Sequence, residues 1–177
     1  MRMDHKAYLL NHDSFVSELA PSLRAALITE QCQPLLDFIN RHHDLLTSPR
    51  EGAPIGDDWI ATLSSRDAHQ FGAIALTKFY SPSQEMGLGA GWKIVDDILV
   101  ADGRFLASPI LGDPFDADGV VFDPGGMGAY FQSPSMVRTS LGMMRTIARY
   151  DATPEVVEAV TMLERAARAG AGLYVTF

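Results

Sequence analysis

Glycine is concentrated in the middle of the chain, and this limits the possible folds more than any other feature. Residues 86–133 hold nine of the fifteen glycines, which bracket short apolar runs, a pattern typical of strands joined by turns. The predicted strands are residues 92–100, 105–111, 120–122 and 129–132. Connections as short as Asp102-Gly103 and Asp118-Gly119 favour antiparallel pairing, because a parallel crossover needs about a dozen residues or more.

Residues 13–80, which precede this strand-rich region, are predicted to be helical. Apolar residues recur there every three or four positions, as on one face of a helix. Because proline fits only the first turn of a helix, Pro21 and Pro34 are each expected to end one helix and start the next. Ser64 and Asp67 have the spacing of a capping box, which predicts that a further helix begins there.

Residues 134–169 return to a helical pattern with clear boundaries. Ser133 and Thr153 each precede a proline, so each predicts a capped helix start. Gly170 is a natural helix stop, and the short apolar segment 171–177 is expected to add a last strand. The sequence therefore predicts an α+β fold in which a central antiparallel sheet is flanked by N-terminal and C-terminal helices.

The composition is that of a globular protein in a reducing compartment. The chain has 177 residues, of which 47% are hydrophobic and 20% charged, so we expect a single α+β domain over residues 1–177. The lone Cys32 has no disulfide partner, and the N-terminus does not resemble a secretory signal. We therefore expect a cytoplasmic protein. Its net charge of −8 argues against binding to nucleic acid or to an anionic membrane.

No segment carries a recognisable catalytic motif, and we expect no catalytic residue, metal or cofactor. Asp116 to Gly119 resembles part of a calcium loop, but Gly125 stands where the bidentate glutamate belongs, so a turn is the better interpretation. Dispersed residues that meet only in the fold stay possible. One alternative is therefore a small hydrolase that uses His42, His69 and an aspartate of the strand-rich region.

Acidic residues are concentrated in the same region as the predicted strands. Residues 85–125 contain eight acids and two bases, so this region can present a negative surface to a basic partner. Arginines of the helical region after it are expected to lie on a solvated helix face. The predicted partner-binding residues are Asp96, Asp97, Asp113, Asp116, Asp118 and Asp123.

Short segments between residues 91 and 150 carry a family resemblance. They are Trp92 at the start of a predicted strand, the run Leu111-Gly112-Asp113-Pro114-Phe115 at the end of a predicted strand, the hairpin-like VVFDPGGMGAYF at 120–131, and the helix start at Ser133-Pro134. Together they resemble the SUKH superfamily, which includes many bacterial immunity proteins against secreted toxins. The first 80 residues show no such signature. The resemblance implies a curved antiparallel sheet with helices on one side and a partner-binding face, and it carries over no catalytic residue.

These observations predict a cytoplasmic immunity or antitoxin protein that binds a cognate toxin with a basic surface. Steering between opposite charges would raise the association rate of such a complex. The hydrolase and an interaction module that has no toxin partner are the alternatives. The sequence leaves the oligomeric state open.

Overall fold

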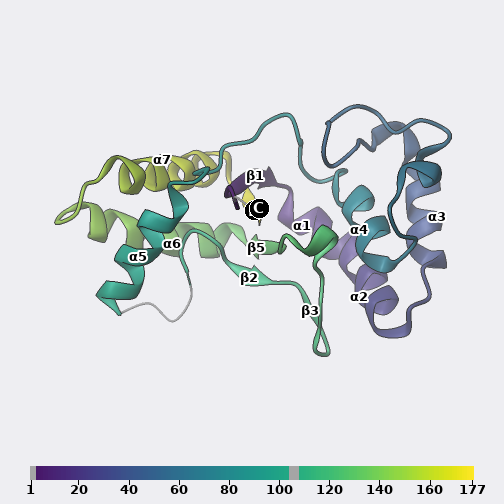
Figure 1. Ribbon diagram of the computed structural model, residues 1–177, viewed down its shortest axis with the longest axis horizontal. Helices are drawn as coiled ribbons and strands as arrows, with labels where there is room; N and C mark the ends of the chain where they lie inside the picture. Colours follow the sequence, from purple (N-terminus) through teal and green to yellow (C-terminus); the bar gives the residue numbers. More distant parts are fainter. Residues whose placement is uncertain (1–2, 104–107) are drawn as a thin grey trace. The chain divides into compact units, whose positions relative to one another are not determined.

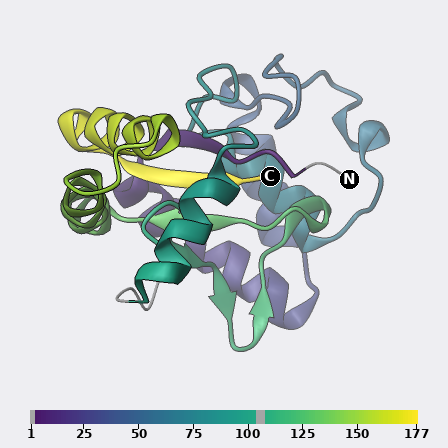
Figure 2. The same ribbon diagram turned by 60° about the vertical axis from the view of Figure 1, so that its left-hand side comes forward.

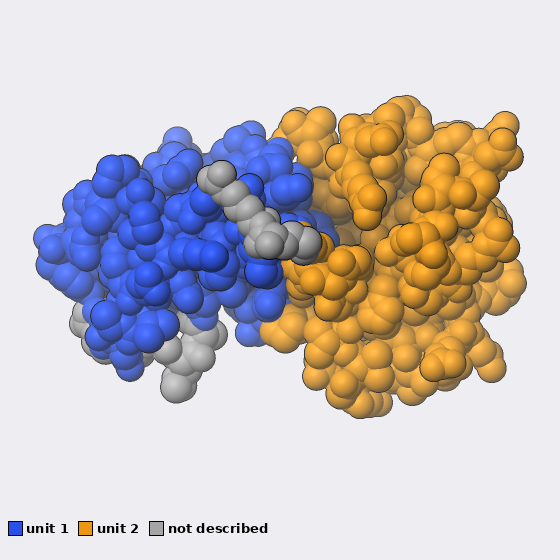
Figure 3. Space-filling model, viewed as in Figure 1, with its two compact units in different colours: residues 1–12, 85–113, 130–177 blue, residues 13–84, 114–129 orange. Residues whose placement is uncertain are grey.

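The computed structural model describes residues 3–103 and 108–177, and the chain divides into two compact units. Unit 1 comprises residues 1–12, 85–113 and 130–177, and unit 2 comprises residues 13–84 and 114–129 (Figure 3). The mixture of helices with an antiparallel sheet confirms the predicted α+β class. The single domain expected from the chain length stays a prediction.

Within its described residues, unit 1 combines strands from both ends of the chain with three helices (Figure 1). Its elements are β1 (Lys6–Leu10), α5 (Trp92–Asp102), β5 (Tyr130–Gln132), α6 (Pro134–Ala148), α7 (Pro154–Ala169) and β6 (Gly172–Thr176). With β2 (Asp113–Pro114) the sheet has the order β1-β6-β5-β2. The predicted last strand is therefore confirmed, and Figure 2 shows it in yellow between β1 and β5.

The pairing in this sheet joins distant parts of the sequence. Strand β6 is antiparallel to β1, with Tyr8 opposite Tyr174, and antiparallel to β5, with Phe131 also opposite Tyr174. The predicted strand at 129–132 is thus confirmed as β5. The 120–131 segment, however, is not a hairpin, because Val120 and Val121 pair with residues 116–117 instead.

The helix boundaries predicted for α6 and α7 are confirmed by their caps. The Ser133 hydroxyl accepts a hydrogen bond from the Met136 amide at 3.2 Å, and the Thr153 hydroxyl accepts one from the Val156 amide at 3.4 Å. Gly170 ends α7 in the left-handed region, with φ at 62°, where glycine carries no steric penalty.

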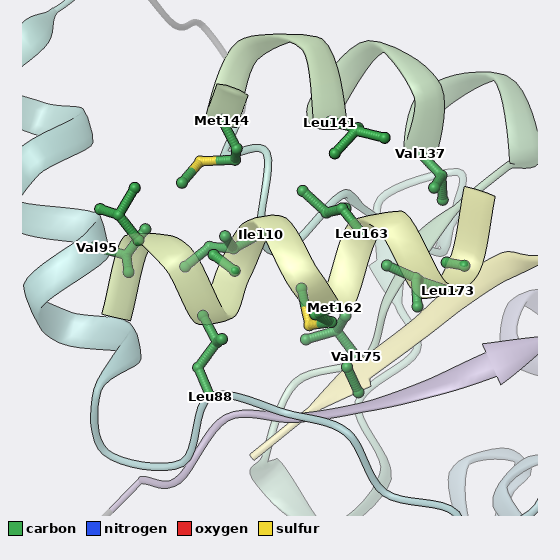
Figure 4. Close-up of a cluster of buried hydrophobic side chains, with 14 of the residues drawn as sticks. Leu88, Val95, Ile110, Val137, Leu141, Met144, Met162, Leu163, Leu173 and Val175 are labelled. Atoms are coloured by element: carbon green, nitrogen blue, oxygen red, sulfur yellow. The ribbon is translucent and has the colours of Figure 1, made fainter. Parts of the chain in front are cut away.

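The core of unit 1 lies between these helices and the sheet, as Figure 4 shows. Helices α6 and α7 pack against each other and against β6, and α5 packs against α7. The labelled side chains of this core are Leu88, Val95, Ile110, Val137, Leu141, Met144, Met162, Leu163, Leu173 and Val175. Removal of these apolar surfaces from water is the main stabilising contribution of the unit.

The predicted strand at 92–100 is wrong, because these residues form helix α5. Val95 and Leu99, four positions apart, are both buried, which is the spacing of a helix face. Gly103 ends the helix with φ at 65° and donates its amide to the Leu99 carbonyl. Of the strand predicted at 105–111, residues 105–107 lie outside the described residues, and residues 108–111 form a turn.

Unit 2 consists of short helices, a small hairpin and loops. Its elements are α1 (His12–Ser14, whose first residue belongs to unit 1), η1 (Phe15–Leu19), α2 (Ala20–Thr29), α3 (Gln33–Arg41), η2 (His43–Leu45), η3 (Trp59–Thr62), α4 (Ala68–Leu76), β3 (Asp116–Ala117), β4 (Val120–Val121) and η4 (Pro124–Gly126). The helical character predicted for this region is confirmed.

The helix boundaries of unit 2 agree with the sequence prediction at the prolines and differ from it at α4. Pro21 and Pro34 each lie in the first turn of a helix, α2 and α3, as predicted. The turn before α2, η1, is a π-helix, in which the Ala20 amide donates to the Phe15 carbonyl. The wider turn lets the helical run continue into a residue that has no amide hydrogen. Helix α4 is capped by Asp67 rather than Ser64, since the Asp67 carboxylate accepts the Gln70 amide at 2.9 Å.

Candidate functional site

The two-stranded sheet of unit 2 is a tight hairpin whose turn was predicted from the sequence. Asp116 pairs with Val121 and Ala117 with Val120, and Figure 2 shows the two short strands side by side. Asp118 and Gly119 have φ values of 53° and 90°, which is the type I′ geometry that aspartate followed by glycine favours. We call residues 114–129, which contain this hairpin and η4, the hairpin segment.

Arg24 of helix α2 holds the hairpin segment in place. Its Nη1 atom donates to the Asp116 carbonyl oxygen at 2.7 Å, and its guanidinium carbon lies 5.1 Å from the centre of the Phe115 ring. A charged hydrogen bond and a cation–π contact therefore fix the same short stretch of backbone. Because the two residues are 92 positions apart, no local sequence signal indicates this contact.

Two aspartates of the hairpin segment stabilise its turns. The Asp116 Oδ1 atom accepts the Gly119 amide at 2.7 Å, and the Asp123 Oδ1 atom accepts the Gly128 amide at 2.6 Å. These bonds restrict the backbone on each side of the tip. Asp118 lies at the tip itself and is exposed. The hairpin segment therefore presents three carboxylates on a defined backbone.

Charge is distributed unequally between the two units. Unit 2 contains twelve acidic and five basic residues, for a net charge of −7, whereas unit 1 contains ten and nine, for a net charge of −1. The hairpin segment itself has three aspartates and no basic residue. Beside the carboxylates, Val120 and Val121 are 39% and 42% exposed, so apolar surface is also available for contact.

The six aspartates predicted to bind a partner do not lie on one sheet. Asp116, Asp118 and Asp123 belong to unit 2, whereas Asp96, Asp97 and Asp113 belong to unit 1. Asp96 and Asp97 lie on helix α5, where Asp96 is half-buried and Asp97 is exposed, and not on the predicted strand. Asp113 is exposed at the start of β2. The expected continuous acidic sheet is therefore corrected to two separate groups of three.

His69 has a structural contact next to the hairpin segment. Its Nδ1 atom accepts the Asp123 backbone amide at 3.0 Å, and its ring is parallel to that of the buried Phe122, with centroids 6.1 Å apart. The lone pair of Nδ1 is thus occupied, which places the proton of the neutral ring on Nε2.

His42, the other histidine of the hydrolase hypothesis, packs on the Phe38 ring with centroids 4.6 Å apart. Burial lowers the pKa of His42, and the nearby cations Lys78 and Arg41 lower it further. Over residues 3–103 and 108–177, no side-chain hydrogen bond joins His42 or His69 to a carboxylate, although the Asp67 carboxylate accepts the backbone amide of His69. Within the same residues, no group of His, Cys, Asp and Glu side chains could hold a metal ion.

His5 of unit 1 is a buried polar residue that the sequence analysis did not single out. The imidazole is fully buried, its Nε2 atom donates to the Ile110 carbonyl at 2.9 Å, and its Nδ1 atom accepts the Leu88 amide at 3.2 Å. Burial lowers the pKa of His5, since the charged form would lose its hydration. A neutral ring therefore joins three segments of unit 1.

None of the helices within the described ranges is long and apolar enough to cross a membrane. No family model, curated protein or solved structure matches the chain.

Proposed function

We propose that the chain is a cytoplasmic immunity protein that binds and neutralises a bacterial toxin with a basic surface, and that the hairpin segment is its contact region. The observation that carries this proposal is the charge distribution: seven of the eight net negative charges belong to unit 2. Within unit 2, the hairpin segment itself contains three aspartates and no basic residue. A surface of this kind attracts a cationic partner and raises its association rate.

The local geometry of the hairpin segment supports a binding role. The side chains of Asp116 and Asp123 each accept a hydrogen bond from a backbone amide. Arg24 of helix α2 donates a hydrogen bond to the backbone carbonyl of Asp116. Carboxylates on an ordered backbone lose less conformational freedom on binding than carboxylates on a flexible loop. The neighbouring exposed valines add apolar contact area, and both features favour a macromolecular partner.

The choice of a toxin as the partner rests on the SUKH resemblance. That resemblance implies a protein that covers its target through a binding face and has no active site of its own. It applies to residues 91–150, which include the whole hairpin segment. The α+β class with an antiparallel sheet is compatible with it.

Co-expression with the product of the adjacent gene tests the proposal. We expect this product to be toxic when expressed alone, to lose toxicity in the presence of the chain, and to copurify with it. The association rate should fall several-fold when the ionic strength rises, since salt screens attraction between surface charges. Copurification of a non-toxic product would make the chain an interaction module, and an association rate independent of salt would exclude the electrostatic contact.

A further inference from the structure

The outer edge of strand β4 is left open by the pairing of the hairpin. The Phe122 amide donates to the Phe115 carbonyl at 2.9 Å, across the hairpin. Hydrogen-bonded pairs alternate with non-hydrogen-bonded pairs in an antiparallel ladder, so the adjacent pair, Asp116 and Val121, is a non-hydrogen-bonded one. The amide and the carbonyl of Val121 therefore point away from β3.

Both of these backbone groups are available for a further hydrogen bond. No described residue forms a hydrogen bond to the amide or the carbonyl of Val121, and Val121 is 42% exposed. The outward amides on each side of it are used within unit 2. The Gly119 amide donates to the Asp116 carboxylate, and the Asp123 amide donates to His69. The edge of β4 thus offers one donor and one acceptor at a single position.

The other strands of the described residues have protected edges. On the outer side of β1, the Ala7 carbonyl accepts the Met86 amide at 2.9 Å. Strand β2, at the opposite edge of that sheet, contains Pro114, which has no amide to offer. In β3 the Asp116 carbonyl accepts Arg24. Proteins commonly protect exposed edges with proline, lysine or a covering segment, whereas β4 consists of two exposed valines, which favour strand pairing.

We propose that the outer edge of β4 binds an extended basic segment of the partner, which adds to the hairpin as a third strand. Pairing with the backbone of Val121 sets the register of the added strand. Asp118 and Asp123 lie on either side of Val121 along the chain, and both are exposed, so lysine or arginine side chains of the added strand pair with them. Strand addition to an open edge is a recurring mode of peptide recognition. The inference rests on the proposed function and deepens it, because it names the conformation and charge of the bound segment.

The charge of the hairpin segment argues against a second copy of the chain as the occupant. Open edges can pair with each other across a twofold axis. Such a pair would bring together three aspartates from each copy and no basic residue. Like charges on paired strands are destabilising, whereas a cationic segment meets the aspartates with opposite charge. The partner is therefore a better fit to this edge than another hairpin segment.

Hydrogen exchange of the Val121 amide, measured by NMR on the full chain, tests the proposal. In the free chain this amide should exchange rapidly, since no acceptor protects it. The product of the adjacent gene, once bound, should slow the exchange by about tenfold or more. Binding of this product without protection of Val121 would overturn the inference and leave the proposed function standing, whereas absence of binding would overturn both. A chain that dimerises alone and protects Val121 would also overturn it.

Two variants at this position separate the backbone from the side chain. Val121→Pro removes the outward amide and keeps the bonds within the hairpin, since edge strands accept proline where the amide faces away from the ladder. Titration calorimetry with the same product should show affinity weaker by about two- to tenfold, the value of one neutral hydrogen bond. Val121→Ile keeps the amide and should change affinity less than about twofold. Unchanged affinity of a Val121→Pro protein with a wild-type amide spectrum would contradict strand addition, and if that variant loses the hairpin, exchange in the wild type decides.

Discussion

The two units have nearly the same length, 89 and 88 residues, but they use polar side chains in different ways. Unit 1 is almost neutral, and its described residues include three buried polar ones, His5, Gln132 and Ser140, each with hydrogen-bond partners inside the unit. Unit 2 buries one, Thr77, and carries most of the net charge. The buried polar groups of unit 1 therefore contribute to its stability, whereas the three aspartates of the hairpin segment in unit 2 are exposed to other molecules.

This contrast shows that a single net charge describes the protein poorly. A value of −8 spread evenly would promote solubility without favouring any contact. Concentrated in one unit, with three aspartates on a fixed hairpin, the same charge favours a specific cationic partner. Substitutions of polar residues should consequently affect folding in unit 1 and binding in unit 2.

The largest expected effect is on the buried network of unit 1. Gln132→Met keeps the side-chain volume but leaves the Pro109 carbonyl and the Ser140 hydroxyl, which both bond to the Gln132 side chain, without a partner. We expect this change to lower the free energy of unfolding by about 2–4 kcal/mol, since each unsatisfied buried group costs about 1–3 kcal/mol. Denaturant titration measures it.

The matched change in unit 2 is Asp118→Asn, which removes a charge from the exposed tip of the hairpin. Asparagine tolerates the left-handed conformation of this position, so the free energy of unfolding should change by less than about 0.5 kcal/mol. Comparable losses for the two variants would contradict the difference between the units.

An intermediate effect is expected from pH. The pKa of His5 is lowered by burial, so below pH 6.5 the unfolded chain binds a proton that the folded chain resists. The free energy of unfolding should therefore fall as the pH decreases from 7.5 to 5.5, by at most about 1.4 kcal/mol per pH unit for this group. His42 shifts in the same direction.

Two glutamine variants separate these contributions to the pH dependence. His5→Gln should flatten the pH dependence of the unfolding free energy more than His42→Gln does, because His5 is fully buried and His42 is half-buried. The reverse order would show that the decisive histidine belongs to unit 2.

A local effect is expected at the attachment of the hairpin to helix α2. Arg24→Ala removes a hydrogen bond and a cation–π contact from an exposed site, for which we expect a local loss of about 0.5–1.5 kcal/mol. Hydrogen exchange of the Phe122 amide, which donates to the Phe115 carbonyl, should accelerate. Arg24→Lys keeps the charge and should have a smaller effect, and unchanged exchange in both variants would mean that Arg24 does not stabilise the hairpin.

The sequence analysis succeeded where a structural signal is local. The caps at Ser133 and Thr153 and the turn at Asp118-Gly119 depend on residues only a few positions apart, and all three are confirmed. Residues 92–100 were misassigned because their β-branched side chains and flanking glycines suggested a strand. The four-residue spacing of Val95 and Leu99 and the terminal glycine were the signals for a helix.

The contacts that define the candidate sites could not be predicted in the same way. Arg24 meets Asp116 across 92 positions, and His5 meets Ile110 across 105. Likewise, strand β1 pairs with the last strand of the chain. Such pairings depend on the packing of the whole unit, whereas periodicity reports only on neighbours along the chain.

The most direct test of the account compares two triple variants that remove the same charge from different units. Asp116→Asn/Asp118→Asn/Asp123→Asn preserves the turn-forming oxygens of the hairpin segment, and Asp96→Asn/Asp97→Asn/Asp113→Asn is its counterpart in unit 1. Stopped-flow association with the copurifying partner should slow about tenfold for the first variant and less than twofold for the second. Equal rates for the two variants would contradict the assignment of partner binding to the hairpin segment.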